Sequence, residues 1–285
     1  MQDVTVIILT KNEEKNLPLC LESVKGFAKR CVVVDSGSTD RTKDIALEYG
    51  VDFYENPFVN YATQFNWGLD NTNIQTRWVV RLDADERFTP ELCKVLEEQM
   101  SLHENDSVNG FVLEARLFFM DKELKHGGSR KKKLMVFKNG IGRIENRKMD
   151  EHTVLSEGEA IEIKEPFLHY DFKDLTSYVK KLNWYATREM QDYMEGAFPK
   201  VGFEASNKEI EQMRGKKTKY YKAPMFWRCW AYFFYAFLIK GNCRNGKEGF
   251  IYSFLYHLYY RILVDAKIYE QKKYNREFEV TGDLK

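Results

Sequence analysis

The first hundred residues alternate between short apolar runs and segments in which apolar residues recur every three or four positions. Runs rich in Val and Ile are typical of strands covered on both faces of a sheet. The intervening spacing is typical of helices with one buried face. This order of elements predicts a mainly parallel sheet with right-handed crossovers. The predicted strands are residues 4–9, 31–35, 51–55 and 78–83. One helix is predicted from capping signals at residues 12–18 and the spacing of Leu17, Leu21 and Val24, and another at residues 41–49.

Polar residues stand at the carboxyl ends of three of these strands. Residues 10–13 (TKNE) follow the first strand, residues 35–38 (DSGS) end the second, and residues 83–85 (DAD) end the fourth. In open α/β sheets ligands bind beyond the carboxyl ends of the strands. The three segments therefore predict one shared ligand site in a Rossmann-like, nucleotide-binding half over residues 1–100.

The DAD segment predicts a metal site. Two carboxylates beside one small residue repel each other, and a divalent cation removes that repulsion while also binding diphosphate oxygens. Mg²⁺ or Mn²⁺ suits such an oxygen-rich set. A lone Asp-x-Asp is often a solvated turn or a helix cap, but its place beside two other polar strand ends favours the metal. The chain has neither GxGxxG nor GxxxxGK[ST], which argues against a dinucleotide fingerprint and a P-loop.

The segments VTVIILTKNEEKNLPLCLESV, VVVDSGSTDRTKDIALEYG and LDADER resemble the nucleotide-sugar-binding half of the family 2 glycosyltransferases. The similarity is greatest to the bacterial branch that extends lipopolysaccharide cores and other surface glycans. It implies an α/β, GT-A fold, a nucleotide-diphosphate sugar donor (a UDP-sugar rather than a GDP-sugar), a divalent cation, Mn²⁺ or Mg²⁺, and inversion at the anomeric carbon.

Two other functions stay open at this point. A nucleotidyltransferase that makes an activated sugar uses a similar sheet, but TKNEEKN lacks the glycine-rich basic loop expected of it. A non-catalytic, membrane-associated partner would keep the fold without turnover, and the presence of two acidic clusters argues against it.

The resemblance also implies residue roles. Asp35 matches an acidic residue placed against the base or ribose, and Ser36 and Ser38 are either ligands or turn hydroxyls. Gln64 and Asn66 either contact the donor or are ordinary exposed helix residues. The implied donor contacts are Thr10, Asn12, Glu13, Asp35, Ser36, Gln64 and Asp83, and the implied metal ligands are Asp85 as the principal one, Asp83 and His152.

A second acidic cluster, MDEH at residues 149–152, lies where the family has its catalytic base. Inverting transfer needs a base that takes the proton of the acceptor hydroxyl. We predict Asp150 as this base, with Glu151 as the alternative, although the family motif is more commonly Glu-Asp. His152 orients the base, helps to bind the metal and diphosphate, or is a structural loop histidine.

The remaining segments of the α/β region carry weaker signals. His126, Gly127 and Gly128 resemble an acceptor-side element in which glycine lets the backbone approach a sugar closely. The RKKK run at 130–133 is predicted as a solvated loop, with diphosphate or anionic headgroups as alternative contacts. His169 and Tyr170 also resemble a family segment and are interpreted as packing residues. A strand is predicted at 110–120, and a strand and turn at 134–140.

The C-terminal third predicts a helical, aromatic-rich extension. We expect a GT-A catalytic domain over residues 1–172, divided at residue 100 into donor and acceptor halves, and a helical region over 173–285. A helix is predicted at 175–193. Segments 223–241 and 248–271 combine aromatic and basic residues, as interfacial membrane helices do. The alternative is that they form core or a homo-oligomer interface.

Composition adds limits to this picture. Aromatic residues make up 15% of the 285 residues, whereas the net charge of +1 gives no indication of nucleic-acid binding. The five cysteines are odd in number and widely spaced, which favours a reducing compartment. No secretory signal or run of about 18 apolar residues is visible. We therefore expect a cytoplasmic protein that is peripheral at the inner face of the cytoplasmic membrane, with a glycan or lipid-linked acceptor.

Overall fold

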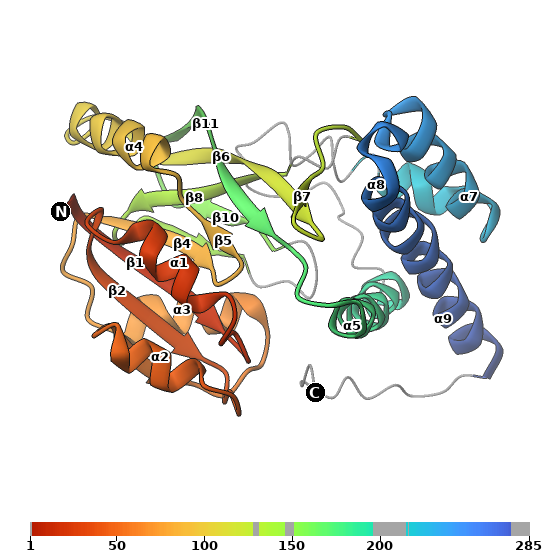
Figure 1. The fold of residues 1–285 in the computed structure, drawn as a ribbon, viewed down its shortest axis with the longest axis horizontal. Helices are drawn as coiled ribbons and strands as arrows, with labels where there is room; N and C mark the ends of the chain where they lie inside the picture. The colour runs from red at the N-terminus through yellow and green to blue at the C-terminus, as the bar shows by residue number, and fades with distance from the viewer. Residues whose placement is uncertain (1, 128–130, 146–150, 196–214, 216, 275–285) are drawn as a thin grey trace. The chain divides into compact units, whose positions relative to one another are not determined.

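The computed structural model describes residues 2–127, 131–145, 151–195, 215 and 217–274, and the chain forms two compact units (Figure 1). The first, called the α/β unit here, contains residues 1–118 and 130–171. The second, called the helical unit, contains residues 119–129 and 172–285. The assignment of catalysis to residues 1–172 stays a prediction.

The α/β unit is built on one sheet whose strand order is β3-β2-β1-β4-β8-β6-β11-β5. Strands β9 and β10 form a separate antiparallel pair. The elements are β1 (Gln2–Thr10), α1 (Leu17–Val24), β2 (Ala28–Asp35), α2 (Thr42–Glu48), β3 (Asp52–Glu55), α3 (Tyr61–Asn71), β4 (Trp78–Asp83), β5 (Glu86–Arg87), α4 (Pro90–Leu102), β6 (Val108–Phe119), β8 (Lys132–Lys138), β9 (Gly142–Ile144), β10 (Thr153–Leu155) and β11 (Glu159–Tyr170).

The predicted parallel half of the sheet is confirmed. β1 lies between β2 and β4 and pairs with both in parallel, and β3 extends this half beyond β2. In this register Thr10 is opposite Asp35 and Leu9 is opposite Asp83. The other half is mixed, because β8 runs antiparallel to both β4 and β6. The polar ends of β1, β2 and β4 therefore lie at one edge of the sheet.

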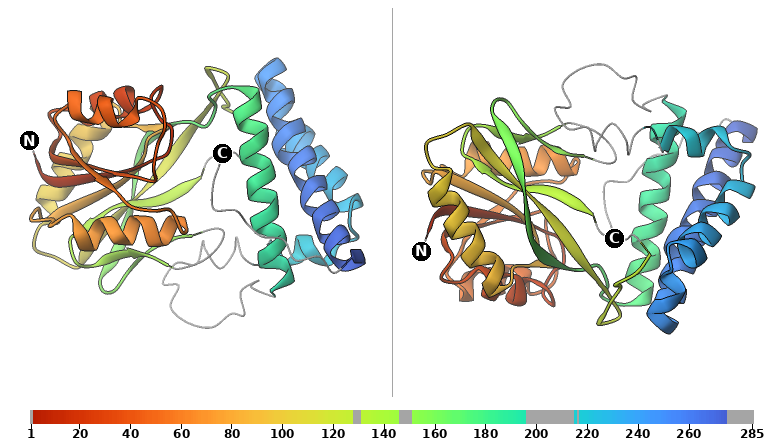
Figure 2. Two further views of the ribbon diagram at one scale, coloured as in Figure 1. Left: turned by 90° about the horizontal axis from the view of Figure 1, so that it is seen from below. Right: turned by 90° about the horizontal axis from the view of Figure 1, so that it is seen from above.

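Helices cover both faces of this sheet (Figure 2). Apolar residues of α1, α2 and α4 pack on one face in a large core cluster that includes Leu17, Ile45 and Leu92. On the other face Phe65 of α3 packs in a smaller cluster with Phe137 of β8. Strands covered on both sides explain the continuous Val and Ile runs in the sequence.

The helical unit contains the long helices predicted from the C-terminal third. Helices α5 and α9 lie side by side in it (Figures 1 and 2). Among the described residues, no helix is both long and apolar enough to cross a membrane. The elements are β7 (Lys122–Glu123), α5 (Leu175–Met194), α7 (Trp227–Phe234), η1 (Tyr235–Ile239), η2 (Asn242–Asn245), α8 (Gly246–Tyr252), η3 (Ser253–Tyr259) and α9 (Tyr260–Tyr274), with η1 and η3 in π-helical geometry.

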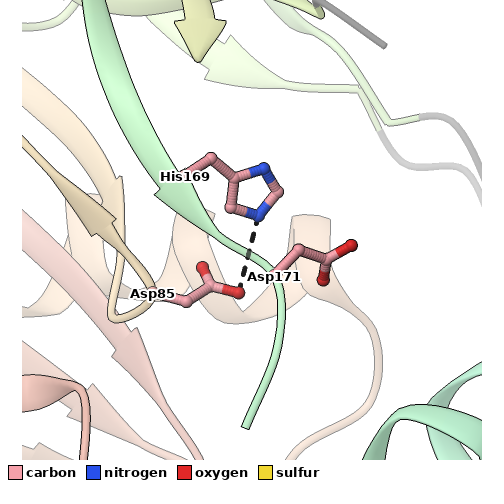
Figure 3. A group of neighbouring side chains, drawn as sticks. All are labelled: Asp85, His169 and Asp171. Atoms are coloured by element: carbon pink, nitrogen blue, oxygen red, sulfur yellow. Dashed lines mark ion pairs between the residues drawn. The ribbon is translucent and has the colours of Figure 1, made fainter. Parts of the chain in front are cut away.

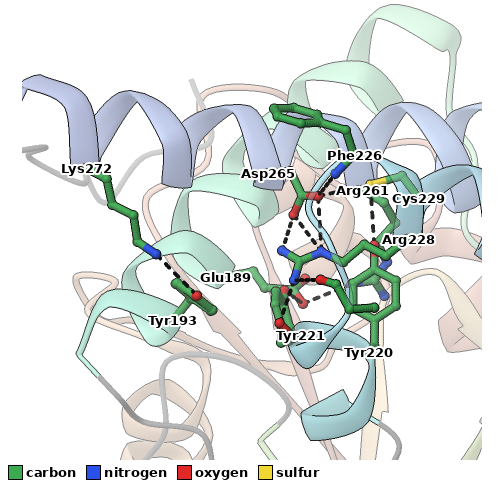
Figure 4. Close-up of polar contacts among 11 residues, drawn as sticks. Glu189, Tyr193, Tyr220, Tyr221, Phe226, Arg228, Cys229, Arg261, Asp265 and Lys272 are labelled. Atoms are coloured by element: carbon green, nitrogen blue, oxygen red, sulfur yellow. Dashed lines mark hydrogen bonds and ion pairs between the residues drawn. The ribbon is translucent and has the colours of Figure 1, made fainter.

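Buried ion pairs hold these helices together (Figure 4). Arg228 of α7 donates to both carboxylate oxygens of Asp265 of α9, with Nε 3.1 Å from each, and both side chains are buried. On α5, buried Glu189 accepts from Arg261 Nη1 at 2.9 Å and from Tyr221 at 2.6 Å. Because a buried charge is costly without a partner, these pairs fix how α5, α7 and α9 pack.

Candidate active site

The carboxylate of Asp35 organises the loop after β2. Its Oδ1 accepts from the backbone amides of Gly37 (2.8 Å) and Ser38 (2.6 Å), and its Oδ2 accepts from the hydroxyls of Thr10 (2.7 Å) and Ser38 (2.6 Å). Four bonds use the acceptor capacity of an ionised carboxylate. Asp35 therefore joins the ends of β1 and β2, whereas its contact with a nucleotide stays a prediction.

The segment after β1 is tied to the same loop. Asn12 has a φ of 54°, its amide donates to Ser38 Oγ at 2.8 Å, and its Oδ1 accepts from the amide of Thr39 at 2.8 Å. Lys11 donates to the carbonyls of Ser36 (3.0 Å) and Gly37 (2.7 Å). These contacts bring the predicted donor segments at residues 10–13 and 35–38 together.

Gln64 is buried on α3, so the alternative of an ordinary exposed helix residue is wrong for it. Its Nε2 donates to Ser36 Oγ at 3.2 Å and to the carbonyl of Asn56 at 3.1 Å, while its Oε1 accepts from Asn56 Nδ2 at 2.8 Å. Asn66 holds β9 by accepting from and donating to the backbone of Ile144. Both residues therefore position the surrounding loops.

Asp83, at the end of β4, is held in a buried network of cations and hydroxyls. It accepts from the hydroxyl of Tyr61 and from Lys133 Nζ at 3.0 Å. Lys133 also contacts the buried carboxylate of Glu86. Burial opposes the ionisation of Asp83, but Lys133 and Arg81 outweigh it and lower the pKa of Asp83. Asp83 is thus an ionised carboxylate with protein partners.

Asp85 lies in the turn between β4 and β5. Its side chain is close to those of His169 and Asp171, which lie at the end of β11 (Figure 3). One ligand atom from each of the three side chains lies within 4.8 Å of the others. His169 Nε2 is 3.5 Å from Asp85 Oδ2. The cluster shares Asp85 with the predicted metal set, but it contains His169 and Asp171 in place of Asp83 and His152.

Strand pairing brings these residues together. β5 pairs antiparallel with β11, so that His169 is opposite Glu86, and the amide of Tyr170 donates to the carbonyl of Asp85 at 2.8 Å. The ring of Tyr170 lies between the guanidinium of Arg87, 3.8 Å from the ring centroid, and a stacked Phe118. The end of β11 is therefore fixed against the DAD turn.

The charges of the cluster act on its histidine. Burial alone would lower the pKa of His169, but the carboxylates of Asp85 and Asp171 and the contact with Asp85 outweigh it and raise that pKa above its ordinary value. A bound cation would replace this proton as the partner of the carboxylates. Two carboxylates and one imidazole are ligands that a divalent transition-metal ion accepts, so these residues fit the predicted cation.

The predicted base lies partly outside the described residues. Asp150 belongs to residues 146–150, which the structure does not describe, whereas Glu151 and His152 directly precede β10. The amide of His152 donates to Glu145 Oε1 at 3.3 Å. Thr153 accepts from Arg81 Nη1 at 3.1 Å, and Arg81 Nε in turn donates to the Tyr61 hydroxyl at 2.9 Å. This chain of bonds ties the start of β10 to the network around Asp83.

The predicted acceptor-side residues belong to the helical unit. The amide of His126 donates to Asn245 Oδ1 at 3.2 Å and that of Gly127 to the carbonyl of Lys240 at 3.0 Å. Gly127 has a φ of 99°, and a Cβ atom there would lie 2.6 Å from Asn242. Glycine at 127 therefore allows close approach to Asn242. Gly128 lies outside the described residues, and contact with an acceptor stays a prediction.

Sequence reasoning missed several residues of the site. The solvated-loop prediction for RKKK is wrong at Lys132 and Lys133, which begin β8, with Lys133 directed at Asp83 and Glu86. His169 was interpreted as packing, yet an H-x-D spacing at a strand end places both side chains on one face. That spacing was the signal for His169 and Asp171.

Comparison with known proteins shows the family of the chain. The model of the glycosyl transferase family 2 matches residues 5–155, more than half of the chain. An uncharacterized glycosyltransferase of Rickettsia felis is 25% identical, and the alignment covers 95% of this chain and 90% of that protein. The lipopolysaccharide core biosynthesis glycosyltransferase LpsC of Rhizobium meliloti is 25% identical over 94% of this chain and 92% of LpsC.

A solved structure, that of S. aureus TarS, has a TM-score of 0.43 and 15% identity, covering 71% of this chain and 46% of TarS. The family match confirms the resemblance and the GT-A type of α/β fold. The chain belongs to glycosyl transferase family 2 and is a glycosyltransferase.

Proposed function

We propose that the α/β unit transfers a sugar from a nucleotide-diphosphate donor to a glycan acceptor, with a divalent cation and with inversion at the anomeric carbon. The observation that carries the proposal is the cluster of Asp85, His169 and Asp171 at the carboxyl edge of the sheet. The polar ends of β1 and β2 lie at the same edge. Nucleotide and cation sites thus adjoin in one region.

The ligand set favours Mn²⁺ over Mg²⁺ as the cation. Mg²⁺ demands oxygen ligands and dehydrates reluctantly, whereas an imidazole nitrogen suits the transition-metal ions better. His169 supplies that nitrogen, and Asp85 and Asp171 supply oxygens. When bound, the ion supplies positive charge for the diphosphate leaving group. Asp83 and Lys133, which pair with each other, position the turn that carries Asp85.

The donor is proposed to be a UDP-sugar, bound by the loops after β1 and β2. Thr10, Asn12, Glu13, Ser36 and Gln64 line or support these loops. The hydrogen bonds from Thr10 to Asp35 and from Gln64 to Ser36 are made within the protein and hold the loops in place. Preorganised loops lower the entropic cost of binding a nucleotide.

The base that removes the proton of the acceptor hydroxyl is proposed to be Asp150 or Glu151. Inversion needs one displacement, with the base opposite the leaving group. The bond from Arg81 to Thr153 connects the segment after this pair to the metal end of β4. We expect one of the two variants Asp150→Asn and Glu151→Gln to abolish transfer while leaving donor affinity unchanged, and that variant identifies the base.

The acceptor is proposed to be a lipid-linked glycan of bacterial surface polysaccharide or lipopolysaccharide. Support comes from the similarity to LpsC, whose name places that protein in lipopolysaccharide core biosynthesis. Work at the inner face of the cytoplasmic membrane follows from such an acceptor.

The test is binding and slow hydrolysis of a panel of UDP- and GDP-sugars, with and without Mn²⁺. We expect selection of one UDP-sugar in the presence of Mn²⁺, and loss of both binding and hydrolysis in Asp85→Ala. Asp44→Ala, an exposed position on α2, is the control and leaves both unchanged. Binding of no nucleotide sugar under any metal condition would contradict the proposed function.

A further inference from the structure

We propose that a surface formed by α7, η1, α8 and the start of η3 docks on a bilayer that contains anionic phospholipid. This surface, called the aromatic face here, consists on α7 and η1 of Trp227, Trp230, Phe234, Tyr235, Leu238 and Ile239. The inference concerns the helical unit alone and does not depend on the transferase activity proposed above.

The aromatic face is one side of the helix over residues 227–239, whose single charged residue, Arg228, is buried against Asp265. Its positions recur at three- and four-residue intervals, so they share one side. Trp227 is 77% exposed and Ile239 is 75% exposed, whereas Cys229, Phe233 and Ala236 on the other side are buried. In a protein surrounded by water, a helix normally exposes polar residues on the side that is not buried, and here that side is apolar. The exposed side therefore needs a partner.

The apolar surface continues onto α8 and η3. Phe237 of η1 contacts Phe250 of α8 at 5.8 Å between ring centroids, and Phe250 stacks with Phe254 of η3 at 6.4 Å. Phe250 and Phe254 are 50% and 45% exposed. Scattered exposed apolar residues are normal, but a continuous exposed patch marks an interaction site.

The charges next to this patch decide which partner it fits. Lys240, Arg244 and Lys247 follow the end of η1, and all three are exposed. Between residues 222 and 254 the only acidic residue is Glu248, which pairs with Lys122 at 2.8 Å. Within this segment the cations outnumber the single acid, and a cationic border attracts anionic headgroups. A second copy would instead bring identical cations together across a two-fold axis.

Asp265 of α9 fixes the start of the helix that carries the aromatic face. The carboxylate of Asp265 accepts from the amide of Phe226 at 2.7 Å as well as from Arg228 (Figure 4). Phe226 has a φ of 65°, and the amide of Trp227 donates to the carbonyl of Met225 at 2.8 Å, as in a tight γ-turn. This strained turn fixes where α7 begins. The aromatic side chains are thus presented on a rigid support, which lowers the entropic cost of docking.

Flotation of the full chain with vesicles tests this inference. We expect binding to vesicles of phosphatidylcholine with phosphatidylglycerol, weaker binding to phosphatidylcholine alone, and release at high ionic strength. Replacing part of the aromatic face by serine should lower the partition coefficient more than about tenfold. The variant is Trp230→Ser, Phe234→Ser, Leu238→Ser; its control changes exposed apolar residues of the α/β unit, Leu47→Ser, Val59→Ser, Leu102→Ser.

The cationic border is tested separately. Each neutral replacement among Lys240→Gln, Arg244→Gln and Lys247→Gln should lower binding to anionic vesicles about fivefold and leave binding to phosphatidylcholine unchanged. The control removes three exposed lysines of the α/β unit, Lys25→Gln, Lys29→Gln, Lys94→Gln, and keeps vesicle binding. Circular dichroism and the thermal midpoint check that each variant is folded.

Three results would overturn the inference. One is an absence of vesicle binding by the unmodified chain at any composition. Another is equal loss of binding in the aromatic-face variant and its control. The third is a dimer in solution that becomes monomeric in the aromatic-face variant while vesicle binding persists, because a second copy would then be the partner. A chain that binds anionic vesicles but no nucleotide sugar would keep this inference and remove the proposed function.

Discussion

Lys133 pairs with two carboxylates next to the proposed metal site. Its ammonium lies 3.0 Å from Asp83 and also contacts Glu86, whose Oε2 accepts from the backbone amide of Asp83 at 3.0 Å. Burial opposes the charge on Lys133, but the two carboxylates outweigh it and raise the pKa of Lys133. Without this cation, two carboxylates near Asp85 would repel each other in a buried setting.

Lys133→Met should therefore be strongly destabilising. Removing one partner of a buried ion pair typically lowers the free energy of unfolding by about 3–5 kcal/mol. The neighbouring Lys132→Met is a matched control, because Lys132 pairs with Glu162 at the surface and should cost less than about 1 kcal/mol. Urea denaturation of both variants measures the difference. Equal stability of the two variants would contradict the role assigned to Lys133.

Glu189 gives the helical unit a pH-dependent stability. Burial opposes its ionisation, but Arg261, Lys217 and two tyrosine hydroxyls outweigh it and lower the pKa of Glu189 to about 2. Because the pKa of Glu189 is lower in the folded state than in the unfolded chain, where it is about 4.3, its ionisation stabilises the fold at pH values above about 4.3. The contribution is lost as the pH falls from about 4 towards 2.

Glu189→Gln should lower the free energy of unfolding at neutral pH by about 3 kcal/mol. The difference from the unmodified chain should shrink as the pH falls through that window. Glu195→Gln, an exposed position at the end of α5, is the control and should give a small, flat difference. Urea denaturation over a pH series tests this; a difference for Glu189→Gln that does not change with pH would show that its charge contributes no stability.

At the scale of elements, the sequence predicted the parts whose signal is local. Short apolar runs predicted β1 to β4, the spacing of apolar residues predicted α1 and α5, and a capping turn predicted α2, because all of these signals lie within a few residues of one another. β5 has only two residues and therefore no period. Its pairing with β11 joins positions about eighty residues apart, and this pairing creates the Asp85 and His169 cluster. For that reason the sequence did not predict that His169 and Asp171 lie next to Asp85.

β11 itself was missed although it carries a strand pattern. Residues 161–164, IEIK, alternate in polarity, but the following Pro166 removes a backbone donor and normally argues against a strand. The structure accommodates it with an irregular register against β6 between Ile163 and Phe167. An irregularity of this kind depends on the neighbouring strand, so the local sequence does not reveal it.

Gly127 connects the short segment before β8 to the C-terminal helices, and its substitution tests that connection. In Gly127→Ala the new Cβ would meet Asn242, which is buried and hydrogen-bonded to Ser253 at 2.6 Å and so cannot move aside. Overpacking and the unfavourable φ of 99° together should lower the free energy of unfolding by about 3 kcal/mol.

Gly140→Ala is the matched control, because Gly140 has a φ of 82° but no atom within 4 Å of the added Cβ. It should cost only about 1 kcal/mol. Comparing the denaturation midpoints of the two variants separates the loss of stability caused by the contact with Asn242 from the loss caused by the unfavourable φ. If Gly127→Ala is as stable as Gly140→Ala but loses acceptor affinity, the predicted acceptor role of Gly127 would explain the glycine better than the contact with Asn242.

At the scale of the whole molecule, one ion should affect two segments far apart in the chain. Asp85 lies in the DAD turn, and His169 and Asp171 lie at the end of β11. A ligand that binds only the folded state stabilises it by about 2.7 kcal/mol at a hundredfold excess over Kd. We therefore expect Mn²⁺ to raise the thermal midpoint and to slow amide exchange in both segments together. The effect should be absent in the helical unit's α5, which carries none of the three residues.

His169→Asn separates this prediction from general ion binding. The variant keeps both carboxylates but loses the imidazole nitrogen, so Mn²⁺ should protect neither segment at concentrations that saturate the unmodified chain, whereas nonspecific binding to acidic residues would be unchanged. His103→Asn is the control, because His103 pairs with Asp106 after α4. Equal protection in His169→Asn would mean that the imidazole is not a ligand. Protection of the Asp85 turn alone would mean that the end of β11 supplies no ligand, and the cation would then depend on Asp83 and Asp85.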